Sequence, residues 1–218
     1  MKKLFLVSSG LGYIQKFVGA DPSTVKMLFV PTAGNLEEDV WWIDKDRDVL
    51  KGMGFQIIEL DIENASKGEM QQQLSNTNVV YVAGGNTFHL LKQLRETGFD
   101  KMLDAFVAKG GLYVGASAGA IIAGPDIGAV SSIDEPEKVD GLKSTKGFGW
   151  VNVIPIPHYD MKSRTRSIDE IKAKYGRDNE IVLLTDDQAL VVEGNEWRVV
   201  ESPRSALEHA WFKKAHLD

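Results

Sequence analysis

The segment with the clearest chemical signature is Gly115–Gly119, GASAG, in which small residues flank Ser117. An apolar, strand-like run precedes it, and an apolar run of helical character follows it. A serine raised at a sharp strand-to-helix turn needs small residues two positions before and after it. The pattern therefore favours Ser117 as a nucleophile. Close helix–strand packing alone would also explain the small residues, and that alternative stays open.

A serine hydroxyl is a weak nucleophile unless a base takes its proton, and the chain contains four histidines. His158 follows the strand-like run VNVIPI and its prolines, which end the strand and stiffen its exit. His89 lies near the start of a predicted helix, and His209 and His216 lie in what we expect to be a polar C-terminal tail. We therefore expect His158 to be the base.

The base needs an acid to orient it. The run IVLL at residues 181–184 is followed, after Thr185, by Asp186 and Asp187. Both carboxylates follow a predicted strand and should lie at the sheet edge where Ser117 and His158 are expected. Either Asp could instead cap a turn. We favour Asp187 as the acid.

An oxyanion needs at least two N–H donors that are already in place. The amide of Ala118, directly after Ser117, is one expected donor. The second is expected from the turn at residues 83–87, AGGNT, where glycine permits close approach of the backbone to a ligand. Such a turn equally suits a phosphate cradle.

Short β-branched runs alternate with segments of helical period, which is typical of parallel strands linked by crossover helices. Near-continuous apolar runs indicate strands that are covered on both faces. We expect a single α/β domain over residues 1–218. The predicted strands are Lys3–Ser8, Lys26–Pro31, Phe55–Leu60, Val79–Ala83, Leu112–Gly115, Val151–Ile156 and Ile181–Leu184, with a hairpin over Ala189–Val200. The predicted helices are Leu36–Met53, Lys67–Leu74, Thr87–Arg95, Phe99–Lys109 and Ser163–Tyr175.

Composition excludes several classes of protein. The absence of cysteine excludes a disulfide scaffold, a cysteine metal site and a thiol nucleophile. The net charge of −6 and the lack of a long basic cluster argue against a nucleic-acid partner. No apolar run approaches the roughly 20 residues that span a bilayer, and the first apolar run ends at Ser8, too early for a signal peptide. We expect a cytoplasmic protein with no membrane partner and, since no metal-ligand spacing occurs, no metal or other cofactor.

Three motifs, in this order and spacing, resemble the peptidase E family of serine peptidases, family S51. They are GGNTF at 84–88, GASAGA at 115–120 and PHY at 157–159, and the likeness extends from the first strand to about Asp187. The resemblance implies a three-layer α/β/α sandwich with a mostly parallel sheet, of the class I glutamine amidotransferase-like (flavodoxin-like) type. It also implies a Ser–His–acid triad.

Carried over by motif, Ser117 resembles the nucleophile, His158 the general base and Asp187 the acid. Gly85 and Ala118 match the oxyanion-hole amides. The implied activity is hydrolysis of a small peptide substrate through an acyl-enzyme.

The sequence departs from the aspartyl dipeptidases of this family in one respect. They carry an Arg shortly after the nucleophile that suits an aspartate side chain, and residues 126–132 contain none. Weaker candidates for substrate binding are Asn86, Asp126 and Asp134. Either Asp could bind a substrate amino group or could equally be a solvated loop carboxylate.

Two other functions stay open on the sequence: an esterase or amidase acting on a non-peptide substrate, and a non-catalytic module that binds a phosphate or carboxylate. We interpret Trp41 and Trp42 as a helix face that packs against the sheet or a partner, rather than as an aromatic platform for substrate. Neighbours on a helix lie roughly 100° apart, so both cannot face the core. One can be exposed at an interface, as in a homodimer.

Overall fold

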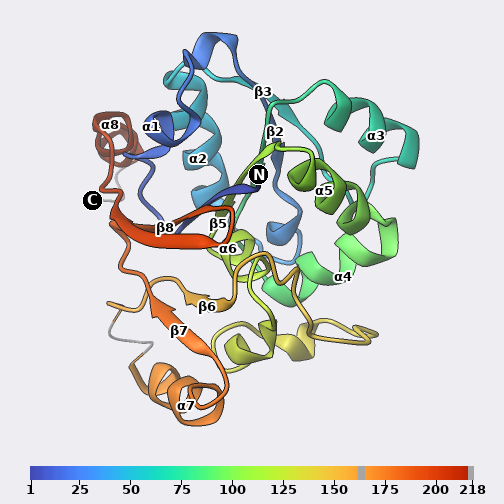
Figure 1. Cartoon of the computed structure of the whole chain (residues 1–218). Coiled ribbons are helices and arrows are strands. Elements are labelled where there is room, and N and C mark those ends of the chain that lie inside the picture. Colours follow the sequence, from blue (N-terminus) through green and yellow to red (C-terminus); the bar gives the residue numbers. More distant parts are fainter. Residues whose placement is uncertain (162–164, 216–218) are drawn as a thin grey trace.

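The computed structural model describes residues 1–161 and 165–215 of the chain (Figure 1). A seven-stranded sheet forms its centre, with the strand order β3-β2-β4-β5-β1-β8-β9. The first five of these strands are mutually parallel, whereas β8 runs antiparallel to β1, and β9 antiparallel to β8. The strands are β1 Lys3–Val7, β2 Lys26–Val30, β3 Gln56–Glu59, β4 Val79–Val82, β5 Leu112–Ala116, β8 Gln188–Glu193 and β9 Glu196–Glu201.

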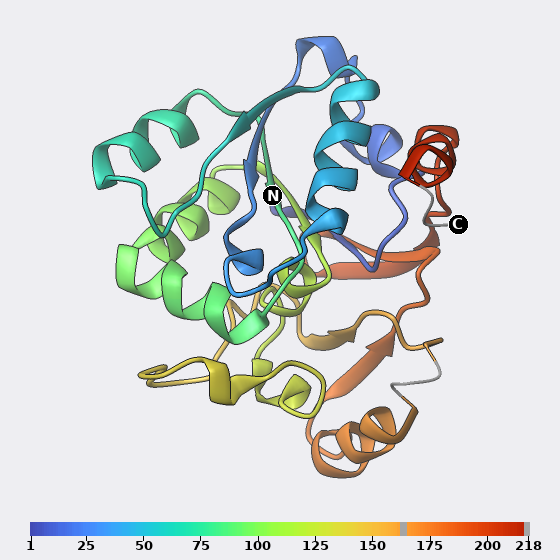
Figure 2. The same ribbon diagram turned by 180° about the vertical axis from the view of Figure 1, so that it is seen from behind.

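Helices cover both faces of this sheet, as Figures 1 and 2 show from opposite sides. On one face, α1, α2 and α8 contribute to an apolar core that includes Phe5, Phe29 and Leu50. On the other face, α3, α4, α5 and α6 pack on Leu4, Leu28 and their neighbours. The helices are α1 Ile14–Val18, α2 Trp41–Gly52, α3 Lys67–Ser75, α4 Thr87–Thr97, α5 Phe99–Ala108, α6 Ala118–Ile121, α7 Thr165–Tyr175 and α8 Ala206–Ala215. The expected three-layer α/β/α class with a mostly parallel sheet is confirmed.

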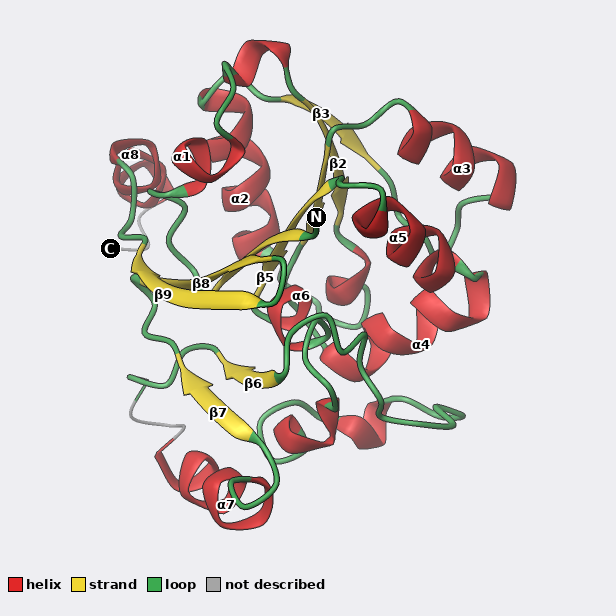
Figure 3. Cartoon of the chain, viewed as in Figure 1, coloured by secondary structure: helices red, strands yellow, loops and turns green. Residues whose placement is uncertain are grey.

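Two of the expected strands form a separate sheet. β6 (Val153–Ile156) and β7 (Glu180–Leu183) pair in parallel, with Pro155 opposite Val182 (Figure 3). A strand containing proline lacks a ladder donor and is disfavoured in the middle of a sheet. The small sheet nevertheless shares the core of the α3–α6 face, because Val153, Ile156 and Val182 are buried there.

Residues 206–215, part of the expected polar C-terminal tail, form the helix α8, which the sequence interpretation did not include. Ser205 and Glu208 make a reciprocal capping box: the Glu208 N–H donates to Ser205 Oγ, and the Ser205 N–H donates to the Glu208 carboxylate. Phe212 is buried. His209 lies in this helix, and His216 lies outside the described residues.

Candidate active site

Ser117 lies between the end of β5 and the start of α6, with φ 49° and ψ −107°. Gly115 and Gly119 allow this turn because neighbouring backbone atoms leave no room for a side chain at either position. A Cβ on Gly115 would be 2.2 Å from the Gly119 carbonyl oxygen, and a Cβ on Gly119 would be 2.4 Å from the Val82 carbonyl oxygen. The Ser117 N–H donates to the carbonyl of Val7 in β1 at 3.0 Å. The segment is thus a sharp strand-to-helix turn anchored to the neighbouring strand.

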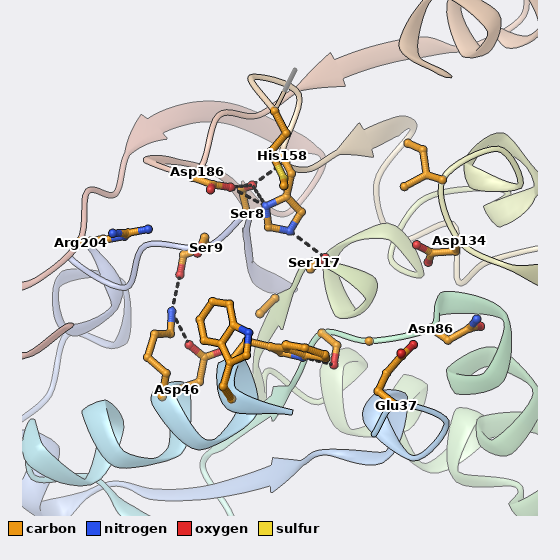
Figure 4. Close-up of a pocket in the computed structure, with 18 of the residues that line it drawn as sticks. Ser8, Ser9, Glu37, Asp46, Asn86, Ser117, Asp134, His158, Asp186 and Arg204 are labelled. Atoms are coloured by element: carbon orange, nitrogen blue, oxygen red, sulfur yellow. Dashed lines mark hydrogen bonds and ion pairs between the residues drawn. The ribbon is translucent and has the colours of Figure 1, made fainter. Parts of the chain in front are cut away.

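His158 follows β6 and turns its ring between a hydroxyl and a carboxylate (Figure 4). Its Nε2 is 3.0 Å from Ser117 Oγ, and its Nδ1 is 2.5 Å from Asp186 Oδ1. Its φ of 58° lies in the left-handed region that L residues rarely adopt. Segments far apart in sequence therefore bring a hydroxyl, an imidazole and a carboxylate into one hydrogen-bonded chain.

The carboxylate in this chain belongs to Asp186, which corrects the expectation of Asp187. The turn after β7 directs the two side chains differently: Asp186 lines the pocket with His158, whereas Asp187 is not among the lining residues. The backbone carbonyl of Asp187 accepts from the Ser202 N–H at 2.7 Å. The hydrogen bond from His158 lowers the pKa of Asp186 despite the opposing effect of burial.

The glycine turn lies beside Ser117. A Cβ on Gly84 would be 3.1 Å from Ser117 Cβ, and a Cβ on Gly85 would be 2.2 Å from the Ala33 carbonyl oxygen. Gly85 has φ 146°, so both its backbone conformation and its surroundings require glycine. Ala118 occupies the first position of α6, where an amide has no partner within the helix.

A pocket of about 470 Å³ opens over Ser117 and includes Asn86 and Asp134 in its wall. The Asn86 Oδ1 accepts from the His89 N–H and so caps α4. The Asp134 carboxylate accepts from both the backbone N–H and the hydroxyl of Thr87. Both side chains are thereby held at the pocket wall.

Asp126 is placed elsewhere, outside the residues that line the pocket. It caps a short 3-10 helix by accepting from the Gly128 N–H and pairs with Lys146 at 3.3 Å. Burial opposes ionisation of this carboxyl group, but these bonds outweigh it and lower the pKa of Asp126. The alternative that it is a loop carboxylate fits its position.

Trp42 packs against the core, as a packing helix face should, and the tryptophan pair also borders the pocket. Trp41 and Trp42 both line the pocket, and Trp41 is 37% exposed. The Trp42 indole N–H donates to the Gly84 carbonyl at 3.2 Å, so this side chain supports the glycine turn. Trp41 packs near Trp211 and Phe212 of α8, a helix that the sequence interpretation lacked.

Several further pocket residues had no role in the sequence interpretation, among them Ser8, Glu37 and Arg204. Ser8 had a readable signal, since it ends a parallel strand next to the one that precedes Ser117. Glu37 and Arg204 lie in loops, and their positions depend on how α2 and α8 pack.

Residues 1–161 and 165–215 contain no group of three or more His, Asp or Glu side chains suited to a metal ion. Within the same ranges, no helix is both long and apolar enough to cross a membrane.

A serine hydroxyl, an imidazole and a carboxylate at strand ends of an α/β sheet form the arrangement typical of a serine hydrolase. Comparison with known proteins narrows this class. The model of peptidase family S51 matches residues 5–200. The chain therefore belongs to peptidase family S51 and is a peptidase of the serine hydrolase class.

Individual relatives agree with the family. An uncharacterized peptidase of Listeria monocytogenes is 32% identical over 198 residues, covering 90% of this chain and 97% of that protein. Peptidase E of Shigella flexneri is 33% identical over 135 residues, covering 61% of this chain and 54% of that protein. A crystal structure of a candidate peptidase E protein from Listeria monocytogenes superposes with a TM-score of 0.86 at 30% identity, covering 92% of this chain and 98% of that one.

Proposed function

We propose that this peptidase hydrolyses short peptides through an acyl-enzyme on Ser117. The observation that carries the proposal is the hydrogen-bonded chain from Ser117 Oγ through both ring nitrogens of His158 to Asp186. In such a chain the carboxylate holds the proton on Nδ1, which leaves Nε2 free to accept the hydroxyl proton.

The reaction then follows from the positions of these groups. Ser117 Oγ attacks the peptide carbonyl carbon while His158 takes its proton, and the amides of Gly85 and Ala118 donate to the resulting oxyanion. The C–N bond breaks as His158 returns the proton to the leaving amine. Water, deprotonated by His158, then attacks the acyl carbon. The bond from this carbon to Ser117 Oγ breaks, and His158 returns the proton to Oγ, which restores the Ser117 hydroxyl.

The size and charge of the pocket support a short substrate. Its volume of about 470 Å³ lies within the range of small-ligand sites. Glu37 and Asp134 lie on one side of Ser117 and Arg204 on the other (Figure 4). Lys45 and Asp46 also line the pocket but pair with each other, and Asp186 pairs with His158. Glu37 and Arg204 are therefore candidate partners for the ammonium group and the carboxylate of a short peptide with free termini.

The test combines an active-site probe with a substrate screen. Wild-type protein and Ser117→Ala are treated with a fluorophosphonate probe and assayed against a dipeptide library and simple acyl esters. We expect the wild type to be labelled at Ser117 and to hydrolyse dipeptides, and we expect Ser117→Ala to do neither.

The other outcomes separate the competing functions. If the wild type hydrolysed esters but none of the dipeptides, the result would support an esterase or amidase acting on a non-peptide substrate. A wild-type protein that is not labelled, under conditions that fully label a control serine hydrolase, would overturn the proposed mechanism.

A further inference from the structure

Ser8 is a buried residue that touches both partners of the nucleophile without facing the nucleophile itself. It follows β1, and only 2% of its surface is exposed. Its Oγ accepts from the His158 backbone N–H at 2.8 Å and lies 3.4 Å from Asp186 Oδ1, to which it donates (Figure 4). The same oxygen is 3.5 Å from His158 Nδ1. One hydroxyl thus contacts the base and the acid.

We propose that Ser8 is a positioning residue that fixes His158 and Asp186 in the geometry needed at Ser117. The inference rests on the proposed function and adds a residue to which the sequence motifs gave no role. Ser8 forms no bond with substrate in this proposal and acts through the two side chains that it holds.

The backbone around Ser8 gives its hydroxyl a fixed position. The Ser8 N–H donates to the Gln188 carbonyl at 3.1 Å, and the Gly10 N–H donates to the Asp186 carbonyl at 2.8 Å. Val7, the preceding residue, accepts from the Ser117 N–H. One strand end therefore contacts the nucleophile, the base and the acid.

His158 needs such support for two reasons. It follows β6, which belongs to the small sheet, whereas Ser117 follows a strand of the main sheet. Its φ of 58° is also costly for a histidine, and such a conformation persists only where neighbouring groups hold it. The bond from the His158 N–H to Ser8 Oγ stabilises this conformation and joins the small sheet to the end of β1.

The direction of the hydrogen bonds determines what Ser8 does electrostatically. Its oxygen accepts from a backbone N–H, so its own proton is available to the Asp186 carboxylate. A donor there favours the charged carboxylate, which in turn holds the Nδ1 proton of His158. The Nε2 lone pair then faces Ser117.

The experiment compares Ser8→Ala with Ser202→Ala. Ser202 is a matched control because it is a fully buried serine whose hydroxyl donates to the Gly10 carbonyl and accepts from the Tyr13 N–H. Gly10 bonds the backbone of Asp186, but these hydrogen bonds of the Ser202 hydroxyl do not reach the side chains of Asp186 and His158. Both variants lose one buried hydroxyl. For each, the fluorophosphonate labelling rate is measured over a range of probe concentrations, together with the melting temperature.

We expect Ser8→Ala to lower the maximal labelling rate by about 10- to 100-fold, since small misplacements of catalytic groups reduce rates on this scale. The half-saturating probe concentration should stay within about threefold of the wild-type value, because the pocket that binds the probe is retained. Both variants should lower the melting temperature by similar amounts, because each loses one buried hydroxyl. Ser202→Ala should nevertheless be labelled at the wild-type rate.

The proposal is overturned if Ser8→Ala is labelled as fast as the wild type, or if Ser202→Ala is slowed equally. Ser117→Ala separates this failure from failure of the proposed function. If Ser117→Ala is not labelled but Ser8→Ala is labelled normally, only the role of Ser8 is wrong. If Ser117→Ala is still labelled, the proposed nucleophile itself is wrong.

Discussion

At the scale of single residues, the site depends on which of two adjacent carboxylates turns toward His158. The Asp186 side chain is 35% exposed and bonds the imidazole, whereas the Asp187 carbonyl is bonded to the segment that follows β9. Side-chain charge is identical at the two positions, so the backbone of the turn after β7 decides the role. The pair therefore offers a matched test of the proposed mechanism.

Asp186→Asn should reduce turnover by about two to four orders of magnitude, because an amide nitrogen facing Nδ1 favours the tautomer that blocks proton transfer at Nε2. Asp187→Asn should keep turnover within about threefold of the wild-type value, as expected for a residue whose side chain lies outside the site. Dipeptide hydrolysis rates measure both. Equal losses in the two variants would show that Asp186 has no special role.

The lowered pKa of Asp186 predicts how stability depends on pH. A carboxylate with a lowered folded-state pKa contributes its full stabilisation above its unfolded-state value of about 3.9. That contribution is lost as the pH falls through the lower folded-state value. The difference in melting temperature between wild type and Asp186→Asn should therefore be constant above about pH 5 and should shrink below about pH 4. A difference that grows on acidification would contradict the assigned direction.

The sequence predicted that Ser117 and His158 meet, because small residues identified the turn and strand ends in a parallel sheet share one edge. It favoured Asp187 over Asp186, which the geometry corrects, because the orientation of the two side chains depends on the φ and ψ angles of a short turn. The position of Ser8 at the end of a neighbouring strand could be predicted from the sequence, but its hydrogen-bond partners could not, because they lie 150 and 178 positions away.

At the scale of elements, the site depends on how closely β5 approaches α6. Gly115 and Gly119 let the two backbones touch, and the Tyr113 hydroxyl donates to the Gly119 carbonyl at 2.7 Å. The sequence predicted this junction from local residues alone. It did not predict that β6 and β7 leave the main sheet, because pairing between strands depends on contacts that are remote in sequence.

Gly115→Ala should destabilise the protein by about 1–3 kcal/mol, the usual cost of overpacking, and should strongly reduce activity, because its Cβ would meet the Gly119 backbone at 2.2 Å. Gly68→Ala is the control: Gly68 lies in α3 with nothing within 4 Å of an added Cβ. The free energy of unfolding of that variant should rise by up to about 0.5–1 kcal/mol, because alanine has a higher helix propensity than glycine. Urea denaturation and probe labelling distinguish the two variants. If Gly115→Ala were as stable and as active as the wild type, the site would not need the close approach of β5 to α6.

At the scale of the whole molecule, a buried ionic cluster joins α2 to α8. Lys45 Nζ lies 2.8 Å from an Asp46 carboxylate oxygen and 3.2 Å from a Glu208 oxygen. Glu208 is fully buried and also accepts from the Leu11 N–H, and Tyr81 donates to Asp46 at 2.6 Å. The cluster holds the C-terminal helix against the wall of the pocket, where Phe212 lies.

Glu208→Ala should lower the free energy of unfolding by about 3 kcal/mol, because it removes one partner of a buried pair and leaves Lys45 only partly neutralised. Glu193→Ala removes an exposed partner of Arg198 and should leave the stability nearly unchanged. Urea denaturation of both variants gives the comparison. The cluster would have no structural importance if the two variants unfolded at the same urea concentration.

Among the described residues, the two non-glycine residues with positive φ are Ser117 and His158, the proposed nucleophile and base. Such conformations cost about 1–3 kcal/mol each. Mutations to glycine at these positions would relieve that cost and would also remove the catalytic groups. Selection for a more stable protein and selection for a working enzyme therefore oppose each other at these positions. A screen for thermostability alone would be expected to enrich inactive variants at both of them.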